Sequence, residues 1–184
     1  MITRKSGILR NIIALAGGAF VTAVLLGALA SEASAAPTIQ LRRNGIDRFD
    51  FHGRVKLDPP SLGGPVDPVA AGFGIELQNE LGTIYKASLL PGDLVPIPNH
   101  YYRFTDRSAR DGSGMRSGLY RVITRFRKYR DGWYYTVYIR AFADLSAATH
   151  PLMTVIFSQV DGTAALTADW VSTRSGWRLP LDRF

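Results

Sequence analysis

Arginine and tyrosine side chains alternate along two neighbouring segments in the second half of the chain, and their types suit the binding of anions. A guanidinium group offers planar, paired donors to phosphate, sulfate or carboxylate groups, and a tyrosine ring offers flat area and a hydroxyl. Gathered on one exposed face, such side chains would bind an anionic polymer such as an envelope polysaccharide. Two alternatives stay open: a solvated face on which arginine and tyrosine stack on each other, and a face covered by another envelope protein or domain. The residues concerned are Arg121, Arg125, Arg127, Tyr129, Tyr134, Tyr138 and Arg140.

The residue types that usually carry catalysis or hold metals form no pattern in this sequence. The three histidines, His52, His100 and His150, have no partner at a metal-ligand spacing. The chain has no cysteine, which excludes thiol catalysis, thiolate metal sites and disulfides. The segment Gly112-Ser113-Gly114 is too short for the turn that exposes a catalytic serine. We therefore expect a non-enzymatic protein without a catalytic residue, a metal or a cofactor. One alternative is an exported carbohydrate-active enzyme in which Glu76 works with a second carboxylate. Another is a subunit whose sheet edge is completed by a second chain.

The first 35 residues have the order of a secretory signal. Basic residues come first, an uncharged run follows over residues 12–30, and Ala33-Ser34-Ala35 offers small residues to a signal peptidase. We predict an N-terminal signal helix that is cleaved after Ala35 or Ala36, and a mature protein in the periplasm or outside the cell. Because the uncharged run is nearly as long as a membrane-spanning helix, an uncleaved anchor is the alternative. In that case residues 12–30 would be the contact with the membrane.

The length and net charge of the chain without the predicted signal indicate one basic domain. The full sequence has 184 residues and a net charge of +7, and without residues 1–35 it has 19 basic and 14 acidic residues. A chain of this length predicts one domain. The positive balance favours acidic partners, but an exported compartment makes a physiological nucleic-acid ligand unexpected. We divide the chain into a signal peptide (1–35), a lead-in (36–45), a β-sandwich domain (46–171) and a C-terminal tail (172–184).

Alternation of apolar and polar residues predicts an all-β domain. In residues 46–57, Phe49, Phe51, Val55 and Leu57 fall on one face of a strand, and charged residues and His52 fall on the other. Three antiparallel hairpins follow, and their turns are predicted at Glu80-Leu81-Gly82, Asp131-Gly132 and Asp161-Gly162. Strands at this spacing predict an antiparallel β-sandwich of about seven to nine strands, with a small β-barrel as the alternative.

The hairpin turns also predict which residues face each other across the strands. In the middle hairpin, the predicted register puts apolar side chains on one face and the arginines and tyrosines on the other. A slip by one residue would exchange the two faces, so burial of the apolar face should fix the register. The pairs predicted for the three hairpins include Leu77 with Tyr85, Val122 with Ala141, Phe126 with Val137, and Val155 with Ala168.

Several of these segments together resemble a known kind of module. The segment Tyr102-Arg103-Phe104-Thr105-Asp106, the small-residue loop before Gly118-Leu119, the long hairpin, Asp144-Leu145-Ser146 and the apolar strand over 152–157 form one pattern. It is similar to β-sandwich modules that recur in exported bacterial proteins, often several in one chain, without an assigned biochemical activity. The resemblance covers residues 46–171, implies the fold and the exported setting, and carries over no catalytic residue. This chain departs from those proteins in having a single copy.

Overall fold

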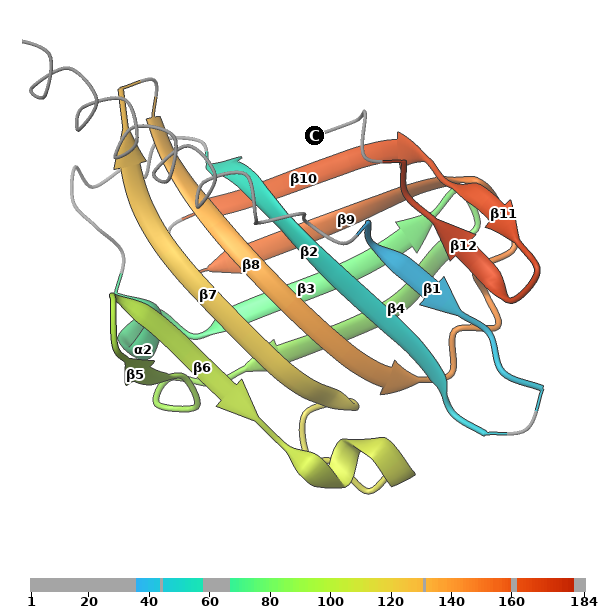
Figure 1. Ribbon diagram of the computed structural model, residues 1–184, viewed down its shortest axis with the longest axis horizontal. Coiled ribbons are helices and arrows are strands. Elements are labelled where there is room, and N and C mark those ends of the chain that lie inside the picture. The colour runs from blue at the N-terminus through green and yellow to red at the C-terminus, as the bar shows by residue number, and fades with distance from the viewer. Residues whose placement is uncertain (1–35, 44, 58–66, 131, 160–161, 181–184) are drawn as a thin grey trace, which may run out of the picture. The chain divides into compact units, whose positions relative to one another are not determined.

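The computed structural model describes residues 36–43, 45–57, 67–130, 132–159 and 162–180, and these residues form two antiparallel β-sheets (Figure 1). The sheets are not closed into a barrel, so the predicted antiparallel β-sandwich is confirmed. The predicted signal helix, residues 1–35, lies outside the described residues. The larger sheet has the strand order β11-β12-β1-β2-β8-β7-β6-β5, and the smaller one has the order β10-β9-β3-β4. The elements are β1 (Thr38–Gln40), β2 (Asp47–Leu57), α2 (Pro68–Ala71), β3 (Phe73–Asn79), β4 (Gly82–Leu89), β5 (Val95–Ile97), β6 (Tyr101–Thr105), the 3-10 helix η1 (Arg107–Asp111), β7 (Leu119–Tyr129), β8 (Gly132–Ala143), β9 (Leu152–Gln159), β10 (Gly162–Asp169), β11 (Val171–Thr173) and β12 (Gly176–Arg178).

The hydrophobic core lies between the two sheets and is made by alternate residues of their strands. Phe49 and Phe51 of β2 are fully buried, as predicted, and the rings of Phe51 and Phe157 lie 4.9 Å apart across the core. The side chains of Val55 and Leu57, which were predicted to point inward as well, lie outside the described residues. The alternation of apolar and polar residues therefore identifies the buried face of β2 at the positions whose side chains the structure describes.

The first hairpin, β3 and β4, has the predicted register over most of its length. Leu77 lies opposite Tyr85 as predicted, but Gly82 pairs with Asn79 instead of lying in the loop. A bulge between Leu77 and Gln78 absorbs the difference. The predicted three-residue turn is therefore shortened to Glu80 and Leu81.

The registers predicted for the other two hairpins are wrong by two residues. Val122 lies opposite Ile139 rather than Ala141, and Phe126 lies opposite Tyr135 rather than Val137. In β9 and β10, Val155 lies opposite Leu166 rather than Ala168. Both errors have the same cause. We placed Gly132 and Gly162 inside the turns, but they are the first paired residues after the turns. Glycine is also common at the last position of a β-turn, so the sequence is compatible with this arrangement. Asp131 and Asp161 lie outside the described residues.

The lead-in and the tail contribute strands to the larger sheet. β1 and β12 pair with each other, and β1 also pairs with β2. Ile39 and Leu179 are buried in the core, and Trp177 donates a hydrogen bond from Nε1 to the carbonyl oxygen of Ala148 at 2.6 Å. The described residues thus form twelve strands, more than the predicted seven to nine, because four strands of three residues each were not expected. No helix among these residues has the length and apolar character needed to cross a membrane.

Candidate functional site

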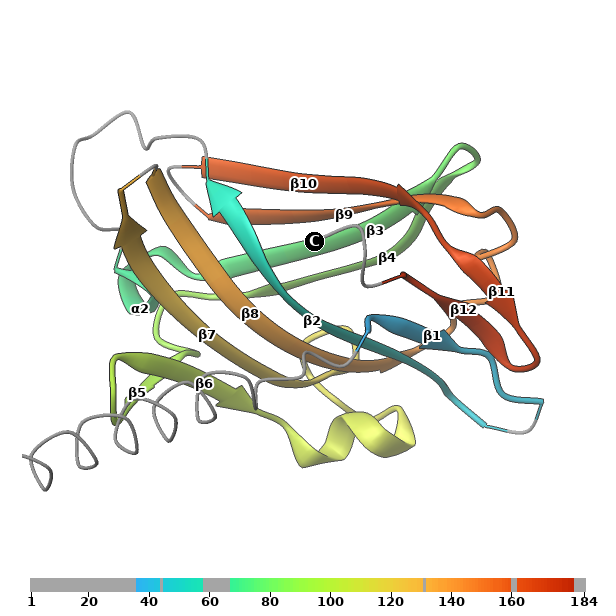
Figure 2. The same cartoon turned by 45° about the horizontal axis from the view of Figure 1, so that its top comes forward.

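Apart from Tyr129, the predicted arginine and tyrosine residues lie on the outer face of the larger sheet, in which β2, β8, β7 and β6 are neighbours (Figure 2). Along β7 the residues alternate between buried and partly exposed, so every second side chain points away from the core. The same alternation holds for β2 and β8. We call the charged and aromatic residues among the described outer side chains of these four strands the arginine face: Arg48, Asp50, His52, Arg54, Tyr101, Arg103, Arg121, Arg125, Arg127, Tyr134, Tyr138 and Arg140.

Six of the seven predicted site residues come together on this face. Arg121, Arg125 and Arg127 lie on β7, and Tyr134, Tyr138 and Arg140 lie on β8. The seventh, Tyr129, ends β7 and pairs with Gly132, and its side chain lies outside the described residues. The prediction placed these residues on one face despite the wrong register, because a shift by two residues leaves each side chain on its own face.

Six further residues of the face were missed as site residues. Arg48, Asp50, His52 and Arg54 come from β2, and Tyr101 and Arg103 come from β6. The polar face of β2 was visible in the sequence as alternation. What the sequence did not show is that β2 lies beside β8 and that β6 lies beside β7.

The charge of the arginine face is strongly one-sided. It carries seven arginines and one carboxylate, Asp50. The carboxylate lies between two of the arginines: Oδ2 is 2.6 Å from Nε of Arg48, and Oδ1 is 2.6 Å from Nε of Arg140. Arg140 also lies directly opposite Arg121 across the strands, and like charges in that position destabilise a sheet. Asp50 therefore offsets the repulsion at this end of the face.

Guanidinium groups lie against the tyrosine rings of the arginine face. The guanidinium carbon of Arg125 is 4.8 Å from the centre of the Tyr101 ring, and Nη1 of Arg125 donates a hydrogen bond to the Tyr101 hydroxyl at 3.4 Å. Arg54 lies 5.5 Å from the centre of the Tyr134 ring. Arg140 lies 5.9 Å from that of Tyr138. Such contacts hold an arginine in place. The tyrosine rings therefore contact guanidinium groups of the protein and are not available in the same way for stacking on a sugar.

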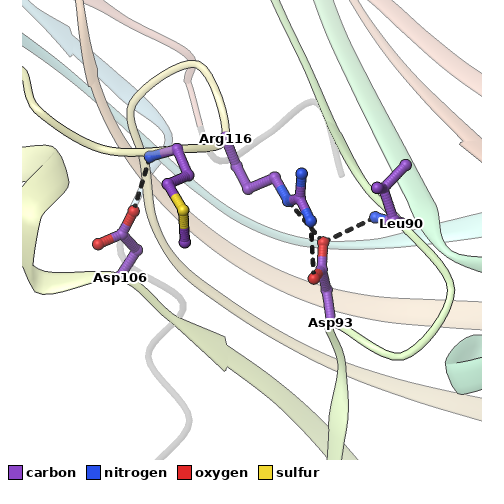
Figure 3. Close-up of polar contacts among 5 residues, drawn as sticks. Leu90, Asp93, Asp106 and Arg116 are labelled. Atoms are coloured by element: carbon purple, nitrogen blue, oxygen red, sulfur yellow. Dashed lines mark hydrogen bonds and ion pairs between the residues drawn. The ribbon is translucent and has the colours of Figure 1, made fainter.

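A separate charged cluster joins the β4–β5 connection to the loop before β7 (Figure 3). Nε and Nη2 of Arg116 lie 2.7 and 3.0 Å from the two carboxylate oxygens of Asp93, which also accepts a hydrogen bond from the backbone N–H of Leu90. Nearby, Asp106 accepts a hydrogen bond from the backbone N–H of Met115. The hydrogen bond from Arg116 lowers the pKa of Asp93, so this carboxylate stays ionised and ties two loops together.

The carboxylate considered for catalysis is held in an ordinary surface ion pair. Glu76 accepts a hydrogen bond from Oγ1 of Thr83 at 2.7 Å and lies 3.0 Å from Nζ of Lys86. The hydrogen bond from Thr83 and the neighbouring Lys86 lower the pKa of Glu76. A lowered pKa keeps Glu76 ionised at neutral pH, whereas a carboxyl group that donates a proton in catalysis needs the opposite shift.

The histidines lie apart from one another. His52 packs edge-on against Tyr138, His100 is exposed in the turn before β6, and Nδ1 of His150 lies 2.7 Å from Oε1 of Glu80. In the part of the chain that the structure describes, no three histidine, aspartate or glutamate side chains are grouped so as to hold a metal ion.

Comparison with known proteins gives no further guide to the site: no protein family model, no curated protein and no solved structure matches this chain. A functional proposal therefore has to come from the residues of the arginine face.

Proposed function

We propose that this protein is an exported, non-enzymatic β-sandwich module that acts through its surface, and that its arginine face binds an anionic polysaccharide at the bacterial envelope or outside the cell. The observation that carries the proposal is the charge of this face. Seven of the sixteen arginines of the chain after residue 35 lie on the outer side of four neighbouring strands, with one carboxylate among them. A surface with one sign of charge attracts polymers of the opposite sign.

The proposal of export is supported by residues 1–35 alone, because their basic, uncharged and small-residue segments follow each other as in a secretory signal. Cell fractionation followed by mass measurement tests it. We expect the protein in the periplasm or the medium, beginning at Ala36 or Pro37. A cytoplasmic protein that retains residues 1–35 would contradict export.

Binding is tested with a pair of polymers that differ only in charge. Dextran sulfate and neutral dextran share the same sugar chain, and titration calorimetry of the purified protein with each separates recognition of charge from recognition of sugar rings. We expect binding of dextran sulfate that weakens as salt is added, because each contact releases bound counterions. We expect no binding of dextran.

Matched variants locate the binding surface. Arg125→Ala with Arg127→Ala removes two charges from the arginine face, whereas Arg43→Ala with Arg174→Ala removes two exposed charges elsewhere. The first pair should lower the slope of log affinity against log salt by about one unit for each lost contact, and the second pair should leave it nearly unchanged. Equal losses in both pairs, or no binding of dextran sulfate by the parent protein, would overturn the proposal.

A further inference from the structure

We infer that the ligand contacts one part of the arginine face, a line of four arginines on β6 and β7, and that it is a linear polyanion recognised by its repeated charges. The inference rests on the proposed function and narrows it to a ligand class and a set of contact residues. We call Arg103, Arg121, Arg125 and Arg127 the β6–β7 arginine line.

The other half of the face has its charge partly cancelled. Both Arg48 and Arg140 lie 2.6 Å from a carboxylate oxygen of Asp50, so the β2–β8 side holds two of its arginines in an internal ion pair network. Such pairs hold the sheet together and leave less net charge for a ligand. Among the described residues of the face, the net positive charge is therefore higher on the β6–β7 side.

The β6–β7 side has no carboxylate of its own. The outward residues beside the line are Tyr101, Thr105 and Ile123, none of them charged. Among the described residues, no ion pair joins the four arginines of the line to a carboxylate. In addition, Nε of Arg121 and Nε of Arg125 are shielded from solvent without a hydrogen-bond partner in the described part of the chain.

The spacing of the line suits a polymer rather than a single anion. Arg121 and Arg127 are six residues apart on one strand, which corresponds to about 20 Å at a rise of about 3.4 Å per residue. Arg103 lies opposite Ile123 on the adjacent strand and fills the gap between Arg121 and Arg125. A small anion reaches one or two of these guanidinium groups, whereas a chain with charges repeated over about 20 Å reaches all four and gains from each additional contact.

The aromatic residue on this side supports recognition by charge. Tyr101 positions Arg125 through a ring contact of 4.8 Å and a hydrogen bond to its hydroxyl. Its ring is thereby engaged by a side chain of the protein, and the contact presents the charged end of Arg125. A neutral sugar chain of the same shape should therefore gain little from this surface.

A length series tests the inference on the purified protein. The probes are oligogalacturonates from the monomer to the dodecamer, with maltooligosaccharides of the same lengths as neutral controls, titrated by calorimetry at low salt. We expect affinity to rise with length until the oligomer spans the line and then to level off, with no binding of the neutral series. Arg103→Ala should weaken binding of the longest oligomer about fivefold, in keeping with roughly 1 kcal/mol for each arginine near an anionic surface.

The outcomes separate this inference from the proposed function. If affinity is the same from the dimer upward while dextran sulfate still binds, the inference that the ligand contacts the whole β6–β7 arginine line is wrong and the proposed function stands. If Arg103→Ala binds the longest oligomer as tightly as the parent, the line is likewise wrong. Because Arg103 is exposed, this variant should fold, and Arg43→Ala provides the control for the loss of one charge outside the face. If neither oligogalacturonates nor dextran sulfate bind, both proposals fail.

Discussion

Replacing Gly118 by alanine should destabilise the fold at the point where the loop carrying Arg116 enters β7. The backbone of Gly118 has a φ of 79°, and a methyl group on its Cα would lie 1.9 Å from the carbonyl oxygen of Phe142. That oxygen belongs to the backbone of β8, so no rotation of a side chain relieves the contact. The two segments are also joined, because the N–H of Phe142 donates to the carbonyl oxygen of Gly118 at 2.8 Å.

The expected loss of stability has two parts. A left-handed backbone costs an L-residue about 1–2 kcal/mol, and separating the segments to admit the methyl group sacrifices a hydrogen bond worth about 1 kcal/mol. We therefore expect Gly118→Ala to lower the free energy of unfolding by about 2–3 kcal/mol. In a domain of roughly 150 residues, this corresponds to a fall in Tm of roughly 4–12 °C.

Gly92→Ala is the matched control for this experiment. Gly92 has a φ of 89°, but no atom lies within 4 Å of the position that its Cβ would take. It therefore carries the backbone cost alone, about 1–2 kcal/mol. Urea unfolding followed by tryptophan fluorescence measures both variants. If the two lose the same free energy within about 0.5 kcal/mol, the steric argument about Phe142 is refuted.

Two further predictions concern the core and the loops. Thr124 is completely buried and its hydroxyl has no hydrogen-bond partner among the described residues, so Thr124→Val should raise the free energy of unfolding by about 1 kcal/mol; a loss in urea unfolding would show that the hydroxyl is satisfied. Arg116 lowers the pKa of Asp93 below its ordinary value of 3.8, so the contribution of this carboxylate is complete above about pH 4 and is lost as the pH falls through the lower folded value. Asp93→Asn should therefore be less stable than the parent near neutral pH, and the difference should shrink below about pH 4; a difference that stays constant down to pH 2 would contradict this account.

The buried and exposed faces of the strands were predictable because alternation with period two is a local signal. Phe49, Val122 and Val137 are buried and Arg125 and Tyr138 are partly exposed, as the pattern indicated. The register of the hairpins depended on a weaker signal, the position of one glycine in each turn. A four-residue turn accepts glycine at more than one position, and the sequence alone could not decide between them.

The neighbours of each strand could not be predicted, because they depend on contacts between distant segments. Asp50 and Arg140 are 90 positions apart in the sequence, yet they form one of the two ion pairs that define the charge of the arginine face. The short strands β1 and β12 were missed for a related reason. Three residues are too few to show alternation, and their pairing with each other joins the two ends of the domain.

The cross-strand pairs of the arginine face support the role in binding that we propose for it. A sheet face selected only for solubility would pair opposite charges across its strands, since such pairs stabilise and like pairs do not. Here Arg121 lies opposite Arg140, Arg125 opposite Thr136 and Arg127 opposite Tyr134. Asp50 compensates one end of the face, and the chain provides no second carboxylate among the outward residues of β6 and β7 that are described. The proposed anionic ligand would supply the negative charges that this side of the sheet lacks.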